Sequence, residues 1–111
     1  MFERNKLKIQ NFFDDDGNPA GGTVEGKGLS VTFQDGPLGR PDENGVLPES
    51  NGAYVEDLLE GAMERLLFYQ RSDFNCRENA IAITKIEEAQ MWLLRRRTER
   101  ESRKVQGTNN P

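Results

Sequence analysis

Apolar and polar side chains alternate early in the chain with the two-residue period of a half-buried β-strand. The stretch LSVTF (residues 29–33) follows this alternation and predicts a strand. The segment KLKIQNFF (residues 6–13) carries Leu7 and Ile9 on one face and predicts a second, shorter strand. DDDGNPAGG (residues 14–22) and the Gly- and Pro-rich residues 35–52 are predicted to be turns and loops.

The period then changes to that of an α-helix. A first helix is expected to begin after an N-cap at Ser50 or Asn51 and to stop near Arg71. Glu56 and Asp57 favour its positive N-terminal end. Its apolar stripe consists of Val55, Leu58, Leu59, Ala62, Leu66 and Tyr69.

A second, longer helix is expected from Arg77 to about Lys104, with Ser72 or Asp73 capping a first turn, because this stretch contains neither Gly nor Pro. Its length would be about 42 Å, which exceeds the width of a domain of this size. Its C-terminal half should therefore project from its own domain or lie along a partner. Its apolar line is Ile83, Ile86 and Leu93, and Trp92 beside this line is interpreted as a core residue.

Composition limits both the core and the chemistry. The chain has 111 residues, enough for one domain, but only 34% are apolar and 31% are charged. That balance favours burial against a second copy or disordered ends. The chain has no His, and its single Cys76 has no His to activate it and fits a reducing cytosol. We therefore expect no enzyme activity, no cofactor and no metal site; DDD at residues 14–16 is interpreted as a solvated turn.

Positive charge is concentrated late in an acidic chain. The net charge is −4, yet six of the 15 basic residues fall between Arg95 and Lys104. Arg96, Arg100 and Arg103 share one helical face. One interpretation is an exposed helix end whose arginines pair with acids such as Glu99, and with Glu101 in the case of Arg97. The other is a phosphate clamp, because a guanidinium binds phosphate with two parallel hydrogen bonds.

Other side chains are suited to a nucleotide base. Tyr69 could stack on a base or simply end the core stripe, and Asn79 could read an adenine edge or cap its helix. Asn79 and Arg96 are 17 residues apart, or about 25 Å along one helix. They cannot touch one small ligand from a single chain. Two antiparallel copies would bring the Asn79 end of one helix to the Arg96 end of the other, twice per dimer.

The C-terminal part of the sequence resembles a known family. GLSVTFQDGPLG (residues 28–39), NGA (residues 51–53) and FNCRENAIAITKIEEAQMWLLRRRTERESRKVQGT (residues 74–108) resemble the phage-encoded Thoeris anti-defence signal sponges. The resemblance covers roughly residues 27–108. These proteins are related to the anti-CBASS cyclic-nucleotide sponges. The resemblance implies an α+β fold, with a small antiparallel sheet packed with two long helices in an obligate homodimer, or a hexamer built as a trimer of dimers.

The same resemblance implies a function and a site. A family member binds glycocyclic ADP-ribose (1''-2' and/or 1''-3') without cleaving it, so that the Thoeris effector in the cytoplasm of the infected bacterial host is not activated. Carried over by motif, the ligand-binding residues are Tyr69, Asn79, Arg96 and Arg100, where many relatives have Phe at the first position. Neither DNA, RNA nor a membrane is an expected partner.

Domain limits and rival functions follow from this interpretation. Residues 1–26 are expected to be an N-terminal extension with a short strand and a turn, residues 27–108 the sponge domain, and residues 109–111 a tail. One alternative is a sponge mainly for cyclic di- or trinucleotides. Two others are a non-enzymatic phage protein whose helix docks a partner, and an enzyme that degrades the signal.

Overall fold

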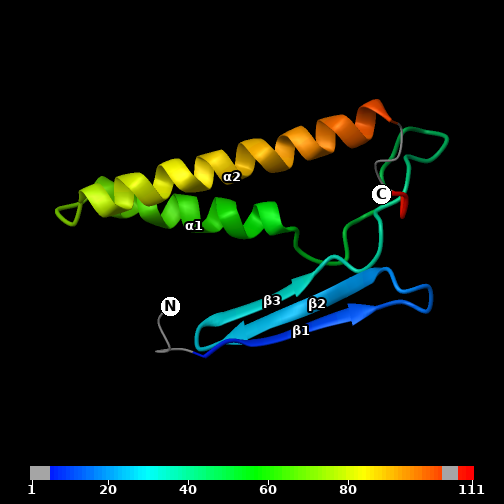
Figure 1. Cartoon of the computed structure of the whole chain (residues 1–111), viewed down its shortest axis with the longest axis horizontal. Coiled ribbons are helices and arrows are strands. Elements are labelled where there is room, and N and C mark those ends of the chain that lie inside the picture. The colour runs from blue at the N-terminus through cyan, green and yellow to red at the C-terminus, as the bar shows by residue number, and fades with distance from the viewer. Residues whose placement is uncertain (1–5, 104–107) are drawn as a thin grey trace. The chain divides into compact units, whose positions relative to one another are not determined.

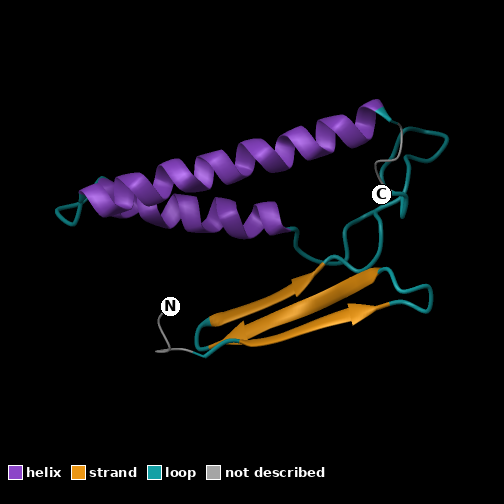
Figure 2. Ribbon diagram, in the orientation of Figure 1, coloured by secondary structure: helices purple, strands orange, loops and turns teal. Residues whose placement is uncertain are grey.

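The computed structural model describes residues 6–103 and 108–111, which form three strands and two helices (Figures 1 and 2). The chain divides into two compact units. The sheet unit contains residues 6–54 and 108–111, and the helical unit contains residues 55–103. The predicted α+β class, with an antiparallel sheet and two helices, is confirmed. The oligomeric state stays a prediction.

The sheet is antiparallel, in the order β1 (Lys8–Phe13), β2 (Pro19–Gly26) and β3 (Leu29–Phe33) (Figure 1). The strands predicted around residues 6–13 and 29–33 are confirmed. Strand β2 is a correction, because the whole of DDDGNPAGG was expected to be turn or loop and its last four residues are strand. Pairing on both sides overrides the weak strand propensity of Pro and Gly. The expected domain boundary after residue 26, where the resemblance begins, lies at the β2–β3 turn and stays a prediction.

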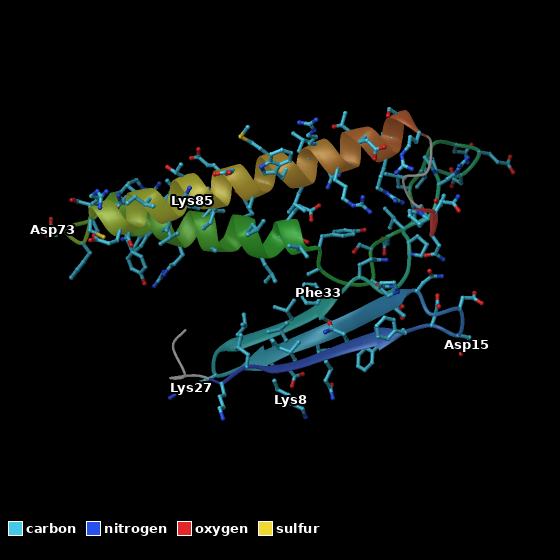
Figure 3. All side chains as sticks on the ribbon, in the orientation of Figure 1. Lys8, Asp15, Lys27, Phe33, Asp73 and Lys85 are labelled. Atoms are coloured by element: carbon cyan, nitrogen blue, oxygen red, sulfur yellow. The ribbon has the colours of Figure 1, made fainter. Side chains whose placement is uncertain are left out.

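Local chemistry fixes the two turns. The Asp14 carboxylate accepts hydrogen bonds from the backbone N–H groups of Asp16 and Asn18, both at 2.9 Å. Gly17 supplies the positive φ of 81° that this turn requires. The Lys27–Gly28 pair forms the second turn, between β2 and β3. Figure 3 labels Asp15 in the first turn and Lys27 in the second.

Strand register produces one apolar and one polar sheet face. Ile9, Val24 and Val31 are paired across the three strands, so their side chains point to the same face. The next cross-strand row on that face ends in Phe33. The opposite face carries polar and charged residues: Lys8, Gln10, Thr23, Glu25, Ser30 and Thr32. On the apolar face, Ile9 remains 59% exposed.

The long loop after β3 is closed by side chains that were expected to cap a helix. The Gln34 side-chain oxygen accepts from the Ser50 hydroxyl and from the Asn51 N–H, both at 2.8 Å. The Asn51 side chain in turn accepts from the Asp35 N–H at 2.7 Å. The prediction of a cap at Ser50 or Asn51 is therefore wrong, because both side chains already bond across the base of the loop.

The two helices form an antiparallel hairpin, α1 (Val55–Gln70) and α2 (Arg77–Ser102), joined by a short loop (Figure 2). The predicted stop near Arg71 is confirmed. Helix α2 begins at the predicted residue, but its N-cap is Cys76 rather than Ser72 or Asp73. It ends at Ser102, and the expected limit at Lys104 lies outside the described residues. Helix α2 is 10 residues longer than α1 and extends beyond it (Figure 1).

The helices bury little of their apolar surface within one chain. Met63 is the one buried hydrophobic residue that the structure describes, at 6% exposure. Ile83, Ile86 and Leu93 are half-buried, as their predicted stripe requires. Trp92 is 59% exposed, so its interpretation as a core residue is wrong for the single chain. Neither described helix has the length and apolar character needed to cross a membrane.

Candidate anion- and base-binding site

Tyr69 and Asn79 lie at the closed end of the helical hairpin, on either side of its connecting loop. Figure 3 labels Asp73 in this loop. Gln70 holds the loop with two hydrogen bonds to the Cys76 backbone. Its Nε2 donates to the carbonyl oxygen at 3.1 Å, and its Oε1 accepts from the N–H at 2.9 Å. This clasp fixes the end of α1, where Tyr69 lies, relative to the start of α2.

The Tyr69 ring is half-buried among neighbours from its own helix. The Phe68 ring meets it edge to face, with centroids 6.0 Å apart. The Arg65 guanidinium lies 5.0 Å from the Tyr69 ring centroid, and its Nε donates to the Tyr69 hydroxyl at 3.2 Å. The ring is therefore held from the side yet remains partly accessible. Sequence reasoning missed Arg65, although its position four residues before Tyr69 was the available signal.

Asn79 is the third residue of α2 and is half-buried. Its backbone N–H donates to the Cys76 sulfur at 3.5 Å, so Cys76 caps the helix and Asn79 does not. Within the described part of the chain, the Asn79 side-chain amide has no hydrogen-bond partner. An amide offers a donor and an acceptor together, which matches the edge of an adenine.

The arginines between residues 95 and 103 have different neighbours, so they differ in the interactions they make. Arg97 Nη2 lies 3.1 Å from the Glu56 carboxylate of α1, not near Glu101 as the sequence suggested. Arg103 pairs with Glu99 of its own helix. The Arg95 guanidinium lies 5.4 Å from the Trp92 ring centroid. Three of the clustered cations are thus engaged by side chains that the structure identifies.

Arg96 differs from these three. It is exposed, and no residue among those described forms an ion pair or hydrogen bond with its guanidinium. Arg100 lies one turn further along α2, on the same face, and is half-buried. The negative end of the helix dipole also favours cations here. Arg96 therefore presents an uncommitted positive fork, which is the chemistry of a phosphate-binding group.

A single chain does not bring these four residues together. Tyr69 and Asn79 lie at the closed end of the hairpin, whereas the Arg97–Glu56 contact places the neighbouring Arg96 level with the first turn of α1. Asn79 and Arg96 remain 17 residues apart on one continuous helix, about 25 Å. The two ends of the hairpin must therefore belong to different half-sites, if they bind one small ligand.

Two surface hollows along the hairpin contain none of the four residues. One, of about 360 Å³, is lined by Arg97 and several acids of α1. The other, of about 460 Å³, is mostly apolar and follows α2 from Met91 to Ser102. Over residues 6–103 and 108–111, no three His, Cys, Asp or Glu side chains gather as a metal site would require.

Comparison with known proteins places these features in one family. Residues 30–98 match the family described as the Acb2/Tad1 hairpin domain. A protein named Thoeris anti-defense 1, from Bacillus phage SBSphiJ7, is 50% identical to the chain over 84 residues. The match covers 76% of this chain and 54% of that protein, so the chain spans about half the length of this curated relative. Tyr69, Asn79 and Arg96 fall inside the matched family segment, and Arg100 lies two residues beyond it.

Proposed function

Because this chain belongs to the Acb2/Tad1 hairpin-domain family, we propose that it is a phage anti-defence sponge. It binds glycocyclic ADP-ribose in the cytoplasm of the infected bacterial host and sequesters it without cleaving it. Sequestration of the signal keeps the Thoeris effector inactive. The name of the 50% identical relative supports the anti-defence role, and the motif resemblance supports the ligand.

The observation that carries the proposal is the uncommitted state of two site residues. Among the residues described, Arg96 has no acidic partner, and the Asn79 amide has no hydrogen-bond partner. A purely structural helix end would be expected to use such a cation as Arg97 and Arg103 are used, in ion pairs. A guanidinium and an amide without protein partners are both available to a ligand.

The chemistry of the ligand matches these groups. Glycocyclic ADP-ribose has two negative phosphates, an adenine and riboses. Arginine forks bind phosphate oxygens, an aromatic ring stacks on the base, and an amide recognises its edge. Arg96 and Arg100 take the first role, Tyr69 the second and Asn79 the third.

The site is composite in this proposal. Two chains pack with their α2 helices antiparallel, so the arginines of one chain meet Tyr69 and Asn79 of the other. A twofold axis then creates two such sites per dimer. Trp92 supports such pairing, because it is 59% exposed, lies one turn before Arg96 on the same side of α2, and Trp is enriched at protein–protein interfaces.

Calorimetric titration with glycocyclic ADP-ribose tests the function. The wild-type protein should bind in the nanomolar range, about −12 kcal/mol, because a sponge must outcompete the effector. Arg96→Ala and Arg100→Ala should each weaken binding by about tenfold to a hundredfold, while the oligomer persists. Lys27→Ala is the control, because Lys27 is an exposed cation in the β2–β3 turn, outside the helical unit.

A second measurement separates a sponge from an enzyme and from a cyclic-oligonucleotide binder. Heating the complex should release the signal with its mass unchanged. Competition with cyclic di- and trinucleotides should leave the signal bound. A cleaved product, or displacement of the signal by those nucleotides at equal concentration, would contradict the proposal.

A further inference from the structure

One cation of α1 is engaged by aromatic rings instead of a carboxylate. The Arg65 guanidinium lies 5.0 Å from the Tyr69 ring centroid and 5.3 Å from that of Phe68. Its Nε donates to the Tyr69 hydroxyl at 3.2 Å. All three residues belong to α1, with Arg65 one turn before Tyr69, so the contact does not depend on any other element.

The contact is specific to arginine in its geometry. A guanidinium can lie against an aromatic ring while one of its N–H groups donates a hydrogen bond to the ring hydroxyl. A lysine ammonium is a compact point charge and lacks this planar set of donors. Among the ion pairs that the structure describes, none uses Arg65. The side chain is thus committed to the Tyr69 ring and its hydroxyl. That commitment restricts the rotation of the ring about its side-chain torsions.

We propose that Arg65 is a positioning residue that holds the Tyr69 ring in place for stacking on the base of a nucleotide ligand. The inference rests on the proposed function. A half-buried aromatic side chain at a helix end otherwise loses rotamer freedom when a ligand binds. Arg65 orders the ring before binding, which removes part of that cost. Arg65 acts through Tyr69 and not by contact with the ligand.

A double-mutant cycle tests whether Arg65 acts through Tyr69. The affinity for glycocyclic ADP-ribose is measured for Arg65 and Tyr69 variants singly and together. Arg65→Ala should weaken binding by about threefold to tenfold, the size of the cost of ordering one side chain on binding. In a Tyr69→Leu background, where the ring is absent, Arg65→Ala should cost nothing further. Arg65→Lys should recover only part of the loss. Lys85→Ala, which removes an equal charge from an exposed site on α2, should leave binding unchanged.

The free protein supplies an independent signature. In a nitrogen-15 NMR spectrum, the Arg65 Nε–H should exchange more slowly in the wild-type protein than in Tyr69→Phe, which lacks the hydroxyl that accepts its hydrogen bond. Tyr69→Leu should also change the chemical shift of this N–H, because one of the two rings beside the guanidinium is lost. Absence of this signature in the wild-type protein would overturn the inference.

The outcomes distinguish a failure of the positioning role of Arg65 from a failure of the proposed function. A loss that persists in the Tyr69→Leu background would mean that Arg65 contacts the ligand directly, and the positioning role would be wrong. Wild-type binding by Arg65→Ala would also end the inference, yet it would leave the proposed function standing. No binding by the wild-type protein would remove both. Melting temperatures within a few degrees of wild type confirm that the variants fold.

Discussion

At the scale of single residues, the side chains around each arginine determine which interactions that arginine makes. The sequence places Arg95, Arg96 and Arg97 side by side and cannot rank them. Successive helix residues point about 100° apart, so each meets a different environment. Arg95 meets Trp92 and Arg97 meets Glu56, while Arg96 meets neither an acid nor a ring in the described part of the chain. The Arg97–Glu56 pair depends on the packing of α1 on α2, which the sequence does not show.

The planar arrangement of N–H donors in Arg96 should contribute more to ligand affinity than its positive charge alone. Arg96→Lys keeps the positive charge but loses the two parallel donors that match a phosphate. We expect it to weaken binding of glycocyclic ADP-ribose by about tenfold, between wild type and Arg96→Ala. Titration calorimetry with Arg97→Lys as the comparison measures this. Equal affinities for Arg96→Lys and wild type would show that charge alone is enough.

At the scale of elements, the helices and strands that the sequence predicts are those whose apolar residues recur with a regular period. Both helices and the strands β1 and β3 follow from apolar spacing. The sequence hides β2, because its Pro and Gly residues argue against a strand until two partners pair with it. It also misplaces the caps, because Ser50, Asn51 and Ser72 are good capping residues that form other hydrogen bonds. Competing partners for a polar side chain are tertiary information.

Two glycines should respond in opposite directions to the same substitution. A Cβ at Gly52 would lie 2.6 Å from the Phe33 carbonyl carbon and oxygen, so Gly52→Ala should lose about 1–3 kcal/mol of stability. A Cβ at Gly61 in α1 meets nothing within 4 Å, so Gly61→Ala should gain about 0.5–1 kcal/mol. Denaturant unfolding followed by circular dichroism compares them. A stability gain from Gly52→Ala would contradict the close approach at that position.

The clasp at the end of the hairpin should link stability to binding. Gln70→Ala removes both hydrogen bonds to the Cys76 backbone, with an expected loss of about 1–2 kcal/mol. Gln70→Glu can still accept from the Cys76 N–H but sets a carboxylate oxygen against the Cys76 carbonyl oxygen, so it should not recover the lost stability. Both variants should also weaken ligand binding, because Tyr69 and Asn79 flank this loop. Unfolding and titration of the same samples check the correlation.

At the scale of the whole molecule, every large apolar side chain that the structure describes, apart from Met63, remains at least partly accessible. Large exposed side chains occur on the apolar sheet face and along both helices, and Met63 is the one buried hydrophobic residue described. The low apolar content predicted this shortage of core, and the length of α2 predicted a projecting half. Neither observation could show which surfaces meet. The pairing of chains, and with it the composite site, therefore stays a prediction.

Self-association should depend on the exposed aromatic side chain beside the proposed clamp. Trp92, with 59% of its surface exposed, lies one turn before Arg96 on the same side of α2. Trp92→Glu should lower the mass measured by light scattering toward that of one chain, because a buried unpaired carboxylate is costly. Lys27→Glu, at an exposed site in the β2–β3 turn, should keep the wild-type mass. A wild-type protein that is monomeric at high micromolar concentration would contradict the pairing.

The most direct test of the composite site is complementation between two defective chains. One chain carries Arg96→Ala with Arg100→Ala, and the other carries Tyr69→Leu with Asn79→Ala. Each variant alone should fail to bind glycocyclic ADP-ribose. Co-expressed with different tags and purified as a heterodimer, the pair should regain one site of wild-type affinity for every two chains, because one of its two pockets is fully wild type. A heterodimer that still binds no ligand, although it assembles, would show that the four residues do not form one pocket between two chains.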